Sequence, residues 1–195
     1  MPDTVGLEQH KLTSLWGIAN KAKADKRHRF RDLYRCLNAE LLLDGWSDLN
    51  KAAASGVDGV TAAAYAENLQ ANIEVLAERL KSKRYRAKLV RRHYIPKENG
   101  KERPLGIPAT EDKLVQAACA KLLTAIYEED FLESSYAYRP GRGARDAVID
   151  LTFDLQYGCY GYLVEADIKG FYDHLDHDRL LAMLSLRIDD KPFSA

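Results

Sequence analysis

The sequence lacks the marks of a secreted or membrane-spanning protein. Its 195 residues include three cysteines, Cys36, Cys119 and Cys159, which lie far apart and match no zinc-binding spacing. No apolar run reaches the length of a membrane span, and the first residues lack the basic-then-apolar order of a secretory signal. These absences predict a cytoplasmic protein with reduced thiols and no membrane partner.

The formal net charge is zero, but the charges are unevenly distributed along the chain. Residues 79–103 contain eleven Lys and Arg against two Glu, residues 21–35 seven against two acidic residues, and residues 111–195 nine against sixteen. Basic segments followed by an acidic one favour a protein that binds a phosphate backbone in one place and a metal in another. The alternative is a solvated helix face, which weighs equally for residues 21–35 and less for residues 79–103.

Hydrophobic periodicity predicts a helical front, a β-hairpin and further helices, which together define an α+β fold. The predicted helices cover residues 12–43, 46–54, 62–81, 111–129, 144–156 and 178–186. The first has a break near Asp25 and a stop at Asp44 and Gly45, and Thr110 is the expected N-cap of the fourth. Residues 55–59 form a turn, and residues 160–167 a strand.

The hairpin is predicted over residues 89–96 and 103–107, because Asn99 and Gly100 stand between two extended segments. Lys97 before the turn and Arg103 after it can present two cations to one anion, such as a triphosphate. The alternative is an exposed hairpin that charge keeps soluble. The spacing alone leaves these two interpretations equal.

Two other segments contain residue types suited to chemistry on nucleic acids. The loop over residues 136–147 combines Tyr138, Arg139 and Arg142 with glycines. Arg and Tyr side chains can hold phosphate, sugar or base, although an ordinary surface loop has the same composition. Further on, the apolar run over residues 160–166 ends at Asp167, and a carboxylate at a strand end suits a magnesium site.

The strings over residues 94–108, 136–147 and 165–177 resemble conserved motifs of the reverse transcriptases encoded by group II introns. Residues 51–61 resemble the N-terminal extension of that family, with alanines where its usual glycine stands. The resemblance covers nearly the whole chain. It implies a right-hand polymerase fold with an N-terminal helical extension in residues 1–55, fingers in residues 56–158 and the start of the palm in residues 159–195.

The resemblance also implies site residues. Incoming deoxynucleotide would be bound by Lys97, Arg103, Ile168 and Tyr172. Template or intron RNA would be bound by Arg91, Arg92, Tyr138, Arg139 and Arg142. Asp167 would be the catalytic carboxylate and would bind Mg²⁺, with Mn²⁺ as the other candidate ion, together with the backbone carbonyl of Ile168. Tyr172, where the family more often has Phe, would exclude a 2′-hydroxyl. Asp173, Asp176 and His177 are interpreted mainly as helix-capping groups.

Complete enzymes of the family carry an aromatic-Ala-Asp-Asp turn after the first carboxylate, and none follows Asp167 here. The acidic residues at 128–130 and at Asp189 and Asp190 do not fit that turn. We therefore expect a fragment of an RNA-directed DNA polymerase that adds deoxynucleotides to a DNA primer only in its complete, two-metal form. The alternatives are a non-catalytic RNA-binding remnant, one half of a split enzyme, or a decayed frame. An uncovered palm strand also makes a homodimer possible in principle.

Overall fold

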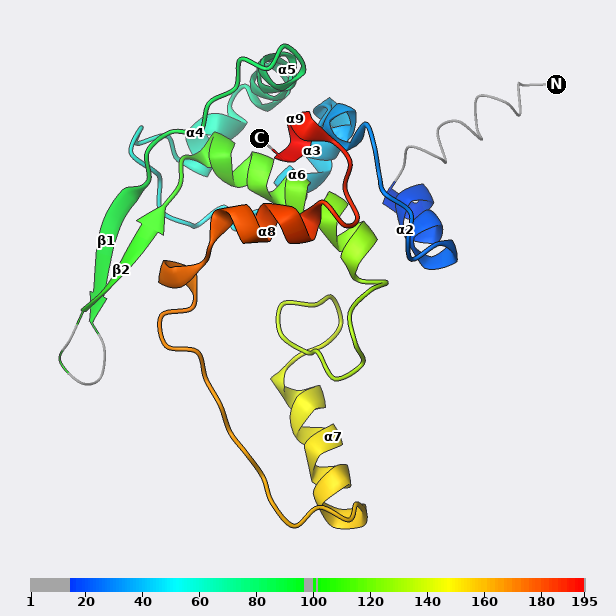
Figure 1. Ribbon diagram of the computed structural model, residues 1–195. Coiled ribbons are helices and arrows are strands. Elements are labelled where there is room, and N and C mark those ends of the chain that lie inside the picture. The colour runs from blue at the N-terminus through cyan, green and yellow to red at the C-terminus, as the bar shows by residue number, and fades with distance from the viewer. Residues whose placement is uncertain (1–14, 97–99, 101, 195) are drawn as a thin grey trace.

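Helix α6 (Thr110–Tyr127) lies at the centre of the fold (Figure 1). The computed structural model describes residues 15–96, 100 and 102–194, and the fold is reported for these. Helices α2 (Leu15–Ala24) and α3 (Ala39–Asp48) pack against α6, and α5 (Leu69–Lys81) packs against α3. The side of α6 that faces them buries Leu114, Ala118, Leu122 and Ile126 at helical spacing. This cluster is the single core that the other elements surround.

The predicted first helix is divided, and its predicted stop is wrong. The break near Asp25 is present, but the short 3₁₀ helix η1 (Leu33–Cys36) stands between α2 and α3. Helix α3 continues through Gly45 to Asp48, so the separate helix over 46–54 does not form. A Cβ atom at Gly45 would lie 3.4 Å from the backbone nitrogen of Ala118. The glycine therefore permits close packing of α3 on α6 and does not end the helix.

The predicted helix over 62–81 is also two helices, α4 (Ala62–Ala66) and α5. Its predicted apolar face is confirmed, because Tyr65, Ile73, Leu76 and Leu80 are buried. The predicted cap of α6 is wrong. Ala109 is the N-cap residue, and the Thr110 hydroxyl donates instead to the backbone oxygen of Val60 at 2.7 Å.

The predicted hairpin is confirmed as an antiparallel pair, β1 (Arg91–Pro96) and β2 (Glu102–Ile107). Arg91 lies opposite Ile107, and Ile95 lies opposite Arg103. The pair projects from the helices as a two-stranded arm with most of its residues exposed (Figure 1). The fold is thus helix-rich α+β, as predicted.

The predicted strand over residues 160–167 is wrong. Helix α7 (Ala144–Tyr157) is confirmed, but residues 158–171 form an irregular connector that runs from its far end to η2 (Tyr172–His174) (Figure 1). A strand forms only where a neighbouring strand accepts its backbone hydrogen bonds. No segment within the described parts of the chain pairs with residues 160–167. Helix α8 (His177–Leu184) follows η2 and confirms the last predicted helix.

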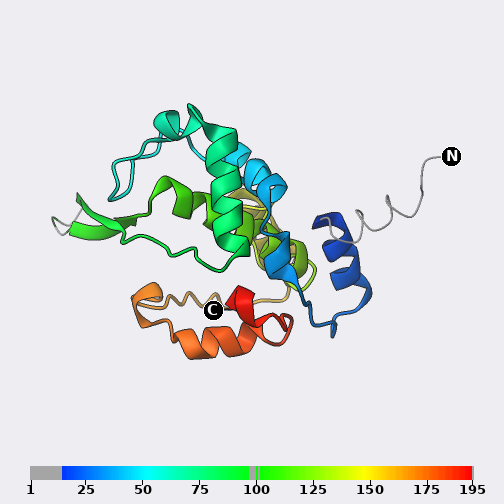
Figure 2. The same cartoon turned by 90° about the horizontal axis from the view of Figure 1, so that it is seen from above.

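The two carboxylates Asp189 and Asp190 do not belong to a loose polar tail. Residues 185–193, here called the C-terminal clasp, return to the N-terminal segment and end in α9 (Lys191–Ser194) (Figures 1 and 2). The amides of Phe30 and Asp189 exchange hydrogen bonds of 2.7 Å with the backbone oxygens of Arg187 and Phe30, respectively. Asp190 is buried and accepts a 2.8 Å hydrogen bond from the amide of Tyr34. The clasp therefore joins the two ends of the described chain.

Candidate nucleic-acid and nucleotide site

The hairpin presents three of the predicted binding cations to solvent. Arg91, Arg92 and Arg103 are exposed, and none of them forms an ion pair with any residue that the structure describes. Side chains alternate along a strand, so the register places Arg91 and Arg103 on one face of the arm and Arg92 on the other. Lys97, the other predicted triphosphate ligand, lies outside the described residues. The arm therefore offers cations on both faces.

The base of the arm is fixed by a carboxylate that the sequence analysis did not single out. Asp112, in the first turn of α6, is buried and accepts hydrogen bonds from the hydroxyl of Tyr85 and, at 3.0 Å, from the amide of Lys88. Burial, together with the hydrogen bond to Asp112, raises the pKa of Tyr85. Lys88 also forms a 2.9 Å ion pair with Asp58. These contacts orient the segment that enters β1.

The loop before α7 keeps two of its three predicted RNA-binding groups occupied within the protein. The guanidinium of Arg139 is 6% exposed, forms a 2.7 Å ion pair with Glu128 and donates to two backbone oxygens. Arg142 is paired with Glu133. Tyr138, by contrast, is 97% exposed and has a φ of 59° in the left-handed region. The loop is thus braced by its arginines and displays its tyrosine, and RNA contact by all three stays a prediction.

The predicted catalytic carboxylate, Asp167, is exposed on the irregular connector. Ile168 and Tyr172, predicted to contact nucleotide, are exposed as well. The turn that follows Asp167 depends on Gly170, which has a φ of 63° and accepts a 2.8 Å hydrogen bond at its backbone oxygen from the His174 ring. Of the three predicted helix-capping residues, Asp176 is confirmed as the N-cap of α8 and accepts from the amide of Arg179 at 3.0 Å.

The metal expected at Asp167 was tested against the neighbouring donors. Among residues 15–96, 100 and 102–194, no three His, Cys, Asp or Glu side chains come together as a group that could hold an ion. Mg²⁺ and Mn²⁺ need several oxygen ligands, and one carboxylate with a backbone carbonyl does not suffice. The described residues therefore do not fit a complete metal site, and no chemical step is assigned to one.

The candidate elements nevertheless share one side of the molecule. Both views place the hairpin and η2 on the same side of the helical body, and the connector with Asp167 leads into η2 (Figures 1 and 2). Helix α7 stands away from that body, with Tyr138 in the loop before it. The arrangement can thus hold an anionic chain across the arm and present a carboxylate beside it.

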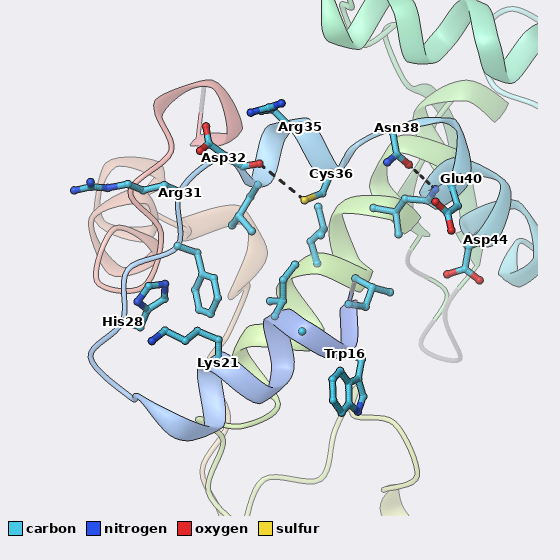
Figure 3. Close-up of a pocket in the computed structure, with 17 residues that line it drawn as sticks. Trp16, Lys21, His28, Arg31, Asp32, Arg35, Cys36, Asn38, Glu40 and Asp44 are labelled. Carbon is cyan, nitrogen blue, oxygen red and sulfur yellow. Dashed lines mark hydrogen bonds between the residues drawn. The ribbon is translucent and has the colours of Figure 1, made fainter. Parts of the chain in front are cut away.

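A second concave region, not foreseen from the sequence, lies between α2 and residues 28–44 (Figure 3). This pocket encloses about 920 Å³ and takes cations from the basic segment 21–35, among them Lys21 and Arg35. Glu40 and Asp44 also line it, and Arg31 is engaged by Asp189 at 2.9 Å. Charges of both signs therefore face the pocket, and charge alone does not make it a phosphate site.

Comparison with known proteins defines the class. Residues 95–188 match the family model described as reverse transcriptase (RNA-dependent DNA polymerase). This match spans β2, the Tyr138 loop, Asp167 and α8, and these residues belong to the reverse transcriptase family.

Individual relatives define the type within that class. Protein YkfC of Escherichia coli K12 is 37% identical over 143 residues, which cover 71% of this chain and 37% of the relative. Group II intron-encoded protein LtrA of Lactococcus lactis is 36% identical over 170 residues, covering 85% of this chain and 28% of LtrA. An uncharacterized 91 kDa protein in the cob intron of Schizosaccharomyces pombe is 38% identical over 121 residues, covering 62% and 15%. The chain is a group II intron-type reverse transcriptase sequence that spans at most 37% of these relatives.

These findings confirm the family predicted from the three motif strings. They do not test the division at residues 55 and 158 into extension, fingers and palm, or the individual site residues, which stay predictions. No helix in the described part of the chain has the length and apolar character needed to cross a membrane.

Proposed function

We propose that this chain forms the template-RNA and incoming-nucleotide binding part of an RNA-directed DNA polymerase of the group II intron type. The fingers would occupy residues 56–158 and the palm would begin at residue 159. The observation that carries the proposal is the exposed cationic arm inside the reverse transcriptase match, on the same side of the molecule as the segment that leads from Asp167 to η2.

Each binding group has a chemical task in this proposal. Arg103, with Lys97 before the turn, binds the triphosphate of a deoxynucleotide, because a guanidinium forks around phosphate oxygens. The exposed ring of Tyr172 limits the space at the sugar. Asp167 supplies one carboxylate to the divalent-metal chemistry that the family uses, and the other ligands come from residues that the structure does not place beside it.

The template RNA is proposed to follow the arm and the loop before α7. Arg91 and Arg92 neutralise phosphates, and the fully displayed Tyr138 offers a ring on which an unstacked base can lie. A DNA primer paired to that template would approach Asp167. The arginines that brace the loop keep Tyr138 in place and so contribute indirectly.

Salt dependence of RNA binding tests this proposal. The affinity of the 195-residue chain for single-stranded RNA, measured by fluorescence anisotropy, should fall linearly on a log–log plot against salt. Replacing Arg91 and Arg92 by Gln should reduce the steepness by about 1.4, because each lost contact to a single strand removes about 0.7.

Arg179→Gln is the matched control, because Arg179 is 87% exposed but lies on α8 away from the arm. It should leave the slope unchanged. A flat slope for the unmodified chain, or a double variant as steep as the unmodified chain, would contradict the proposal.

The second candidate function is RNA binding without catalysis, either as a remnant or as one half of a split enzyme. The uncovered apolar surface of α7 and the connector favours it. Primer extension on RNA with Mg²⁺ separates the two. Extension that disappears in Asp167→Ala assigns polymerase activity to the chain, whereas RNA binding without extension supports the second candidate.

A further inference from the structure

Helix α7 and the connector after it expose an unusually large apolar surface. None of the residues of α7 is buried, although Val148, Leu151 and Leu155 form a stripe along one side. In the connector, Leu163 is 67% and Val164 87% exposed. Apolar surfaces of this extent on a folded protein mark places where another polypeptide binds.

The connector has the sequence of a strand whose partner is missing from the fold. Its even-numbered residues are apolar, namely Tyr160, Tyr162, Val164 and Ala166. The odd-numbered positions hold Gly161, Leu163 and the carboxylates Glu165 and Asp167. Alternation of this kind gives a strand one apolar and one polar face. An unpaired segment of aromatic and β-branched residues is a ready template for strand pairing.

We propose that a second copy of this chain supplies the missing strand. Residues 160–166 of the two copies pair antiparallel around a two-fold axis at Leu163. In this register Tyr162 of each copy lies opposite Val164 of the other, and Tyr160 lies opposite Ala166. All apolar even-numbered side chains then share one face of a two-stranded ribbon.

The acidic residues select this register. Centring the pair on Glu165 or on Asp167 would set two like carboxylates face to face, and centring it on Ala166 would set Glu165 against Asp167. Like charges directly opposite are destabilising. An axis at Leu163 sets Glu165 opposite Gly161 and joins leucine to leucine, whereas an axis at Val164 would set Glu165 against Leu163. The sequence is therefore self-complementary in one register.

Helix α7 supplies the cover that such a ribbon needs. A two-stranded ribbon alone is marginally stable in water, and its apolar face must pack on another element. Helix α7 is joined to the strand through Gly158 and exposes the stripe at Val148, Leu151 and Leu155. In the dimer these stripes pack on the even-numbered face of the ribbon.

A charge-pair experiment on the 195-residue chain tests the axis. Leu163→Lys and Leu163→Glu each place like charges opposite each other, so each variant alone should self-associate roughly tenfold or more weakly than the unmodified chain. An equimolar mixture places Lys opposite Glu and should restore association. Sedimentation equilibrium over the micromolar range measures all three.

The controls separate the interface from the fold. Leu186→Lys and Leu186→Glu alter an exposed leucine outside the proposed surface and should leave association unchanged. Leu163 is exposed in the single copy, so far-UV circular dichroism should show both of its variants folded. A monomeric unmodified chain, or a mixture that associates no better than its components, would overturn the proposal. Either result leaves the salt dependence of RNA binding untouched.

Discussion

Replacing Arg187 should destabilise the fold more than replacing any exposed arginine. Its guanidinium is 7% exposed and forms a 2.8 Å ion pair with Asp130, just beyond α6. It also donates to the backbone oxygens of Asp25 at 3.0 Å and His28 at 3.1 Å, just beyond α2. A single side chain thus ties the C-terminal clasp to both the N-terminal segment and the central helix.

The magnitude follows from this burial. Removing one member of a buried ion pair typically costs 3–5 kcal/mol, because the other charge remains without its partner. Asp130 is 24% exposed, so water partly solvates it once the arginine is gone. We therefore expect Arg187→Met to lower the free energy of unfolding by about 3 kcal/mol, a large share of a domain's usual total.

Urea unfolding followed by circular dichroism measures the change. Arg179→Met, at an 87% exposed position, is the matched control and should change the free energy of unfolding by less than about 0.5 kcal/mol. Asp130→Asn combined with Arg187→Met should cost less than the two single changes added together. A loss below about 1 kcal/mol for Arg187→Met would refute the reasoning, because a buried and paired guanidinium cannot be lost so cheaply.

Three further changes test packing, burial and capping. Gly56→Ala should cost about 2 kcal/mol in thermal unfolding, because its Cβ would lie 2.5 Å from backbone atoms of Ala109, whereas Gly143→Ala meets nothing within 4 Å and should be neutral. Tyr65→Phe should stabilise the fold by about 1 kcal/mol at pH 7, since the buried hydroxyl has no partner among the described residues. Burial raises the pKa of Tyr65 from 10.0 to about 12, so the tyrosine form alone should lose stability as the pH rises between these values. Asn38→Ala removes the cap of α3 and should cost about 1 kcal/mol in urea unfolding, whereas no loss would exclude a capping role.

Local sequence signals were sufficient where neighbouring residues decide the structure. The spacing of Ile73, Leu76 and Leu80 predicted the buried face of α5, and Asn99 and Gly100 predicted the hairpin. At Gly45 the same reasoning was wrong, because contact with α6 across the core, and not the local backbone preference, decides that position. A distant contact overrode the local signal.

Pairing between distant segments was the part that the sequence could not predict. The clasp depends on Arg187 meeting Asp130 and on Ile188 meeting Phe30, and no local pattern encodes either contact. The strand over residues 160–167 failed for the opposite reason. Its alternation is correct for a strand, but a strand also needs a neighbour, which the described fold does not supply.

The candidate site was predictable as a set of motifs but not as a geometry. The resemblance identified the segments around Arg103, Tyr138 and Asp167, and the family comparison confirms the class. It did not show that Arg139 is occupied by Glu128, or that Asp112 fixes the base of the arm. Burial and partners separate residues that brace the site from residues that face a ligand.

Photo-crosslinking of single-stranded RNA to the 195-residue chain tests the central claim most directly. Peptides linked to the RNA are identified by mass spectrometry, with Arg91→Gln and Arg92→Gln as the weakened form. The account predicts crosslinks within residues 91–107 and at Tyr138, and their loss from the arm in the weakened form. Crosslinks confined to the pocket between α2 and residues 28–44, with none on the arm, would contradict it.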